Sequence, residues 1–252
     1  MMALERSDNV SKIKGKIFWG IILGMMLFSN SVNAQEIFYQ NDLGVTLSKQ
    51  EYEFISNMYW EGYQEYLTLD DYNEFKSMNL FNRSVEKVTK EIVDVSLMRG
   101  ASVTSHLRTL TIAKSCSDTC VISLVNKWIG TPTIKSYDVF GARVTGVSIN
   151  NIKNALVTGD NYGKSYSNPK SYDNGFGYSV LVPNVGNVKA SVTFFTTRSG
   201  TIYGSYQHAM RNTTEAVSKQ YTIGLGGYGK VFNFTGSALD IYDNAPGVDI
   251  QV

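Results

Sequence analysis

Residues 107–128 read LRTLTIAKSCSDTCVISLVNKW, and this stretch decides the fold class. Two runs with alternating apolar side chains, Leu107–Lys114 and Val121–Trp128, flank a short segment bounded by Cys116 and Cys120. Alternation with a period of two is typical of strands, and a short polar connection between two such runs predicts an antiparallel hairpin. Residues that face each other across such a pair lie about 4.5–5.5 Å apart at Cα, which is within the range of a disulfide. The stretch therefore predicts a β-hairpin closed by a Cys116–Cys120 bond.

The cysteine spacing argues against the other common roles of a cysteine pair. A thioredoxin-type redox pair has two intervening residues, whereas Ser117, Asp118 and Thr119 separate these cysteines. A zinc site would have to recruit His106 and His208, the two histidines of the chain, which lack the spacing of a histidine pair. We therefore expect a structural disulfide and no metal site.

Further strand-like runs follow along the chain, and no helical period separates them. Short strands at close spacing favour an antiparallel β-sandwich or jelly roll over a βαβ fold. The sequence thus predicts a mainly β protein with a β-sandwich domain over residues 81–252. The expected strands lie at Ile92–Leu97, Leu107–Ile112, Val121–Trp128, Tyr137–Ile149, Tyr178–Val182, Val188–Thr197, Thr201–His208, Val217–Ile223 and Val231–Phe234.

The N-terminus has the three parts of an export signal. Lysines at positions 12, 14 and 16 form a positive region, Ile17–Phe28 is an uncharged apolar run, and a small-residue cleavage pattern ends at Ala34. The apolar run of 12 residues would be about 18 Å long as a helix, whereas a hydrocarbon core is about 30 Å thick. We therefore expect residues 1–34 to be a signal peptide cleaved after Ala34, and the mature chain to be secreted without a transmembrane segment.

Residues 35–80 have a different pattern from the rest of the chain. Ser48 with Glu51, and Thr68 with Asp71, have the spacing of helix-capping pairs, and each pair precedes aromatic residues at helical spacing. This segment therefore predicts a short acidic helical hairpin with an aromatic seam.

Charge is unevenly divided between this hairpin and the β domain. Gln35–Phe75 contains nine acidic residues and one lysine, whereas the chain from Lys76 onward has 18 basic and 11 acidic residues. The net charges of −8 and +7 mark a boundary near residue 80 and predict attraction between the two parts. We expect the hairpin to bury its aromatic side chains on the sheet. The alternative is a separate module that docks a partner.

The sequence lacks the common motifs of catalysis and cofactor binding. There is no Gly-x-Ser-x-Gly elbow, no His-Glu-x-x-His and no phosphate-binding loop. The formal net charge of +1 gives no electrostatic reason to expect nucleic acid. We therefore expect no catalytic residue, no cofactor and no nucleic-acid partner. Carboxylates such as Asp138 and Asp173 still leave a secreted hydrolase open, because two of them in a cleft would suffice for glycoside hydrolysis.

The segment Gly159–Gly177 is the candidate binding region. Its 19 residues show no periodicity, and loops of this length are usually functional or disordered. Tyrosine together with asparagine and aspartate is typical of binding surfaces, because flat rings stack while amides and carboxylates form hydrogen bonds. The composition favours a loop that binds a glycan or another cell-surface component, and the alternative is a linker between two groups of strands. The expected anchors are Tyr162, Tyr166, Tyr172 and Phe176.

Several strings of the mature chain carry a resemblance to a known class of proteins. They are EYEFIS at 51–56, YWEGYQ at 59–64, SYDV at 136–139, AR at 142–143 and YGSYQH at 203–208. In these strings the chain resembles uncharacterised secreted proteins of Gram-positive bacteria. The resemblance implies export and no particular activity.

Three function classes stay open at this point. The first is a non-catalytic binding or envelope-associated protein, which the aromatic segment, the export signal and the missing motifs favour. The second is a membrane-active, pore-forming or bacteriocin-like toxin, because Ser191–Ser205 alternates small polar and apolar residues as a pore-forming hairpin does. The third is a secreted hydrolase. No pattern in the sequence indicates an oligomeric state.

Overall fold

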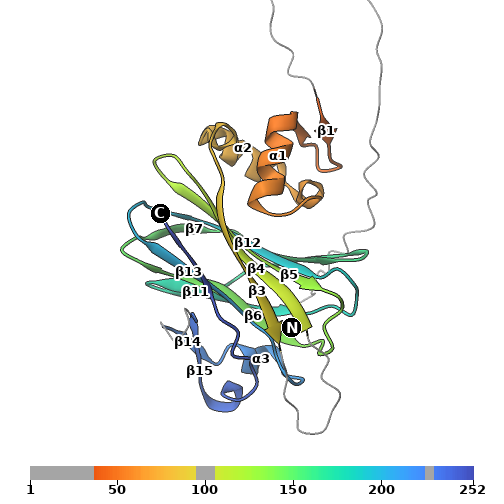
Figure 1. Ribbon diagram of the computed structural model, residues 1–252, viewed down its shortest axis with the longest axis vertical. Coiled ribbons are helices and arrows are strands. Elements are labelled where there is room, and N and C mark those ends of the chain that lie inside the picture. Colours follow the sequence, from red (N-terminus) through yellow and green to blue (C-terminus); the bar gives the residue numbers. More distant parts are fainter. Residues whose placement is uncertain (1–36, 95–105, 225–229) are drawn as a thin grey trace, which may run out of the picture. The chain divides into compact units, whose positions relative to one another are not determined.

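A computed structural model describes residues 37–94, 106–224 and 230–252 of the chain. The chain divides into two compact units between Arg83 and Ser84 (Figure 1). The predicted signal peptide, residues 1–34, lies outside the described residues. None of the helices in the described ranges has the length and apolar character that spanning a bilayer requires.

The first unit contains the two predicted helices. α1 (Lys49–Met58) begins after Ser48, whose side chain accepts a hydrogen bond from the Glu51 amide while the Glu51 carboxylate accepts one from the Ser48 amide. α2 (Leu69–Ser77) is capped by the side chain of Thr68. The capping residues therefore set both helix starts, as the sequence predicts. The other elements of this unit are β1 (Tyr39–Gln40), β2 (Thr46–Leu47), and the 3-10 helices η1 (Tyr63–Tyr66) and η2 (Leu80–Asn82).

Aromatic side chains pack together inside the first unit. The ring of Phe81 lies 5.3 Å from the ring of Phe54, 5.5 Å from that of Tyr72 and 6.3 Å from that of Phe75. Part of the predicted aromatic seam is thus buried within the unit itself. The packing of the helical hairpin on the β domain stays a prediction.

The second unit is a sandwich of two antiparallel sheets, which confirms the predicted fold class. Within the described residues, one sheet has seven strands in the order β3-β4-β5-β12-β8-β9, with β7 also paired to β12, and the other has five in the order β10-β11-β6-β13-β16. The first sheet comprises β3 (Glu86–Asp94), β4 (His106–Cys116), β5 (Cys120–Ile129), β7 (Ile149–Ile152), β8 (Ala155–Gly159), β9 (Tyr162–Tyr166) and β12 (Lys189–Thr196). The second comprises β6 (Tyr137–Thr145), β10 (Lys170–Tyr172), β11 (Gly175–Leu181), β13 (Thr201–Gln207) and β16 (Val248–Gln251).

Apolar side chains from both sheets meet in one core. Leu124 on β5 and Phe194 on β12 belong to the seven-stranded sheet, Phe140 on β6 and Phe176 on β11 belong to the five-stranded sheet, and all four are fully buried in this core. The rings of Phe176 and Phe194 meet edge to face across the sandwich, with centroids 5.1 Å apart. The alternating pattern of the strands therefore produces the two inner faces that a sandwich needs.

The hairpin predicted from residues 107–128 is the β4–β5 pair. Its register places Cys116 directly opposite Cys120, and the two cysteines form a disulfide with a Cα–Cα distance of 4.1 Å. The predicted hairpin and the predicted disulfide are both confirmed.

Removing this disulfide should weaken the fold without abolishing it. We expect a Cys116→Ser/Cys120→Ser variant to lose about 2 kcal/mol of unfolding free energy, because the bond closes only a very short loop of the unfolded chain. Urea titration of the variant, beside the wild type with and without reductant, measures the difference. A variant as stable as the oxidised wild type, or one that cannot fold, would contradict this estimate.

The run Ser191–Ser205 does not form a pore-like hairpin. β12 belongs to the seven-stranded sheet and pairs with β5, β7 and β8, whereas β13 belongs to the five-stranded sheet and pairs with β6 and β16. The chain therefore passes from one sheet to the other between these strands. The toxin hypothesis predicts that Ser191–Ser205 forms a hairpin, and this prediction is wrong because β12 and β13 do not pair.

The described residues between 209 and 245, which we call the cap, cover the outer face of the five-stranded sheet. They include α3 (Glu215–Ser218), β14 (Tyr221–Ile223), β15 (Phe232–Phe234) and the 3-10 helix η4 (Gly236–Ala238) (Figure 1). Val139 on β6 packs with the cap in a second apolar cluster, on the opposite face from its neighbour Phe140. Gly177 on β11 leaves room for the cap, because a Cβ there would lie 2.5 Å from the Tyr221 hydroxyl oxygen.

Candidate functional site

The segment Gly159–Gly177 folds as strands, so the predicted loop is wrong. β8 continues through the turn Asp160–Asn161 into β9, and β10 pairs with β11 in a second hairpin. Asn161 adopts a φ of 53°, in the left-handed region that asparagine enters more readily than most residues. Some of the polar residues that suggest a loop lie in the turns at 160–161 and 173–174, and others lie in the short strands themselves.

Two of the four expected anchors, Phe176 and Tyr172, contact the sandwich core and the cap respectively. Phe176 is fully buried in the sandwich core, so its predicted place on a binding surface is wrong. The hydroxyl of Tyr172 donates to the carbonyl oxygen of Tyr221 at 2.5 Å, and the ammonium group of Lys170 donates to the same oxygen at 2.9 Å. These contacts attach β10 to the cap. A binding role for Tyr172 stays a prediction.

The other two anchors, Tyr162 and Tyr166, share one face of β9 with Lys164 between them. β9 is an edge strand of the seven-stranded sheet, and both tyrosines are half-buried whereas Lys164 is exposed. The Lys164 ammonium group lies 4.9 Å from the centre of the Tyr166 ring, within the range of a cation–π contact. We call these three residues the tyrosine edge.

Tyr166 connects the tyrosine edge to the other sheet. Its hydroxyl accepts a hydrogen bond from the Leu181 amide at 3.1 Å and donates one to the Leu181 carbonyl oxygen at 3.4 Å. Leu181 is the last residue of β11 in the five-stranded sheet. The Tyr166 side chain therefore links the two sheets beside the edge strand β9. The ring is therefore held in one orientation before any ligand arrives.

The tyrosine hydroxyls of this edge stay protonated at neutral pH. Burial is the main cause that raises the pKa of Tyr162 and of Tyr166; the neighbouring Tyr162 raises the pKa of Tyr166 further, and Tyr137 on β6 adds a smaller rise to both. A neutral phenol both donates and accepts a hydrogen bond. Sequence reasoning missed Tyr137, because it lies in the other sheet and no local pattern links it to β9.

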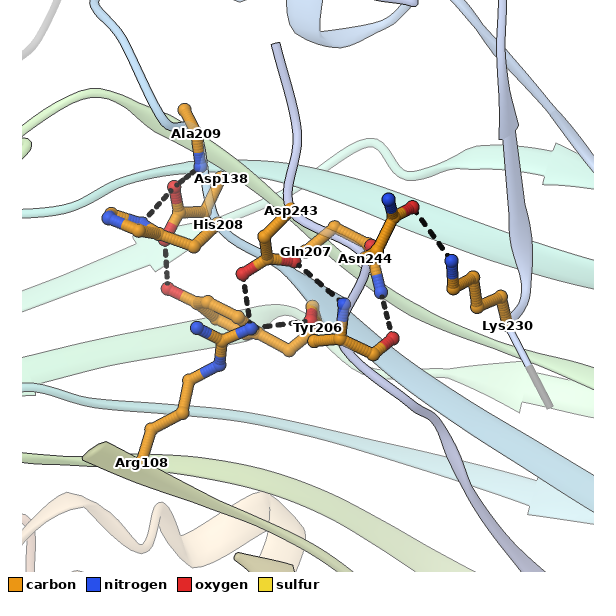
Figure 2. A network of polar contacts seen from close by, with 10 residues as sticks. Arg108, Asp138, Tyr206, Gln207, His208, Ala209, Lys230, Asp243 and Asn244 are labelled. Carbon is orange, nitrogen blue, oxygen red and sulfur yellow. Dashed lines mark hydrogen bonds and ion pairs between the residues drawn. The ribbon is translucent and has the colours of Figure 1, made fainter. Parts of the chain in front are cut away.

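A buried charged network lies at one end of the sandwich, where β4, β6 and β13 meet the cap (Figure 2). The Arg108 guanidinium is 0% exposed and pairs with Asp243 at 2.5 Å. It lies close to two aromatic rings, 5.0 Å from the centre of the Trp128 ring and 5.6 Å from that of Tyr206. The guanidinium is therefore held by a carboxylate and by two ring faces.

Asp138 is the second carboxylate of this network. It accepts hydrogen bonds from the Tyr206 hydroxyl at 2.7 Å and from the Ala209 amide at 2.9 Å, and Nδ1 of His208 lies 2.9 Å from its Oδ2 atom (Figure 2). We call Arg108, Asp138, His208 and Asp243 the buried quartet. Sequence reasoning missed the quartet, because its members are distant along the chain and each sits in an ordinary strand or turn pattern.

The arrangement of the quartet favours a structural role over a catalytic one. An aspartate–histidine pair is part of many nucleophilic sites, but here His208 is 1% exposed and Asp138 is 0% exposed, so a substrate does not reach the imidazole in this conformation. In the part of the chain that the structure describes, no group of three or more His, Cys, Asp or Glu side chains is placed to hold a metal ion.

Comparison with known proteins adds only distant likenesses in fold. No protein-family model and no curated protein sequence matches the chain. The collagen-binding domain of a surface protein of Erysipelothrix rhusiopathiae is similar over 66% of this chain and 59% of its own, with 7% identity and a TM-score of 0.30. The pilus backbone protein of Streptococcus pneumoniae is similar over 36% of this chain and 25% of its own, with 16% identity and a TM-score of 0.28. At these scores the likenesses carry no argument about function.

Proposed function

We propose that this chain is an exported, non-catalytic binding protein whose tyrosine edge binds a glycan or another component of a cell envelope. The observation that carries the proposal is the placement of Tyr162, Lys164 and Tyr166 on one face of an edge strand, with both rings half-buried and the lysine exposed. Both rings pack at the margin of the sandwich core, so a ligand at this edge would contact Lys164 and the exposed parts of the two rings.

The chemistry of the tyrosine edge suits a sugar. An aromatic face packs against the C–H groups of a pyranose ring, a neutral phenol donates and accepts hydrogen bonds, and an ammonium group donates hydrogen bonds to sugar hydroxyls. The bonds between Tyr166 and Leu181 reduce the side-chain entropy that binding would otherwise cost. The edge therefore offers a preorganised surface, and the predicted export signal supports a ligand among envelope glycans.

A pull-down on purified cell walls and immobilised polysaccharides tests this function. We expect the wild-type protein to be retained and a Tyr162→Ala/Lys164→Gln variant to be released, because loss of an aromatic hot spot commonly costs 2 kcal/mol or more, roughly thirtyfold in affinity. Tyr203→Ala is the matched control, because Tyr203 is a half-buried tyrosine that packs with the cap cluster. Failure of the wild type to bind any of these materials would contradict the proposal.

A further inference from the structure

Both ends of the cap are attached to the buried quartet. At its beginning, the Ala209 amide donates to Asp138 at 2.9 Å. At its end, the Asp243 amide donates to the His208 carbonyl oxygen at 2.9 Å, and the Asp243 carboxylate pairs with Arg108. The quartet therefore joins the two stems of the cap to strands β4 and β6 of the sandwich.

The charges of the quartet balance only when His208 carries a proton on both ring nitrogens. The charged and titratable groups that face His208 include Asp138 from β6, Arg108 from β4, and Asp243 from the end of the cap. Tyr206 from β13 binds the same carboxylate of Asp138, and the ring of Trp128 from β5 lies 4.7 Å from the imidazole. Two carboxylates thus face one guanidinium, and an imidazolium supplies the missing positive charge.

We propose that His208 is a proton-operated latch for the cap. The protonated imidazole keeps the quartet neutral and holds both cap stems against the sandwich. Loss of that proton leaves an uncompensated carboxylate in a buried site, which is costly. The cap is then released from the outer face of the five-stranded sheet at alkaline pH, while the sandwich stays folded.

The direction of this switch follows from the environment of the imidazole. Burial alone lowers the pKa of His208, but the charge of Asp138, its hydrogen bond and the charge of Asp243 outweigh burial and the opposing charge of Arg108, so the pKa is raised. A raised pKa in the folded state means that the latch is fully closed below about pH 6.5, the ordinary value, and opens as the pH rises through the folded value. Each unit of the rise corresponds to about a tenfold change in the closed-to-open ratio.

The contacts that remain explain why the cap would open and the sandwich would not. The cap is otherwise held to the five-stranded sheet by the second apolar cluster around Val139, by the bonds from Lys170 and Tyr172 to the Tyr221 carbonyl oxygen, and by the Tyr242 hydroxyl, which donates to the Tyr137 carbonyl oxygen at 2.9 Å. The sandwich has its own, larger core between the two sheets. Local opening of the less buried part is therefore expected to need less free energy than unfolding of the sandwich.

Hydrogen–deuterium exchange of the full chain between pH 6 and pH 9, corrected for the intrinsic exchange rate, tests the latch. We expect protection in residues 209–224 and 230–245 to fall across this range, whereas β5 and β12 keep their protection. His208→Gln should give low cap protection at every pH. Asp138→Asn should move the midpoint of opening to lower pH, because it removes the charge that favours the imidazolium.

Lys230→Met is the matched control, because it removes an exposed contact of the cap, the Lys230–Asn244 hydrogen bond at 2.8 Å, and leaves the quartet intact. It should keep the pH dependence of the wild type. Three results would overturn the latch: cap protection that is constant from pH 6 to pH 9 in the wild type, parallel loss of protection in β5 and β12, or a midpoint that Asp138→Asn leaves in place.

Discussion

An Asp243→Ala variant is expected to lose about 3–5 kcal/mol of unfolding free energy. The reason is that Arg108, which is 0% exposed, would keep its charge in a buried site after losing the carboxylate with which it forms an ion pair. The rings of Trp128 and Tyr206 contact the guanidinium but do not neutralise it. Chemical denaturation of the variant and the wild type, at a pH near 6, measures the loss.

A double variant separates the buried charge from simple loss of packing. Arg108→Met/Asp243→Ala removes both charges, so it should be more stable than Asp243→Ala alone. Glu215→Ala is the control for an ion pair at the surface, because the Glu215–Lys219 pair is about half exposed and such pairs contribute only about 0–1 kcal/mol. A loss of less than about 1 kcal/mol in Asp243→Ala would mean that the guanidinium is solvated and the buried quartet is not formed.

Phe176→Ala should be the most destabilising change within the segment that was expected to bind a ligand. Phe176 is 0% exposed and packs edge to face on Phe194, so its removal leaves a cavity between the two sheets. Substitutions of this kind cost about 3–5 kcal/mol. Thermal or urea unfolding measures the loss.

Tyr162→Ala is the comparison for this prediction, because Tyr162 is a half-buried residue of the same segment. It should cost clearly less stability than Phe176→Ala, since less apolar surface leaves the water when it folds. If the two substitutions cost the same, the contrast between a core residue and an edge residue does not hold.

The sandwich could be predicted because its signal is local. Alternation over Leu107–Lys114 and Val121–Trp128 identifies two strands, and the cysteines between them set the register. The helix caps at Ser48 and Thr68 are equally local, since each uses a backbone amide three residues away. Such patterns require no knowledge of distant contacts.

The strands within Gly159–Gly177 could not be predicted from the sequence, because short edge strands lack that signal. β9 has five residues and β10 has three, and their outward side chains are polar, so no apolar alternation marks them. The tyrosines of β9 were singled out for their composition, but their common face follows only from the strand.

The buried quartet could not be predicted because it depends on tertiary contacts. Arg108 and Asp243 are separated by 135 residues, and Asp138 and His208 by 70. Arg108 shares an alternating face of β4 with Leu110 and Ile112, and this is the one sequence signal that could have indicated a buried partner. The pattern does not say which carboxylate that partner is.

The dissociation constant of a cell-wall polysaccharide retained in the pull-down is the most direct test of the tyrosine edge. Isothermal titration of the wild type, Tyr162→Ala/Lys164→Gln and Tyr203→Ala, each checked for an unchanged folded state, provides it. The account predicts binding that is roughly thirtyfold weaker or more in the double variant and unchanged in Tyr203→Ala. Equal affinity of the double variant and the wild type would contradict it.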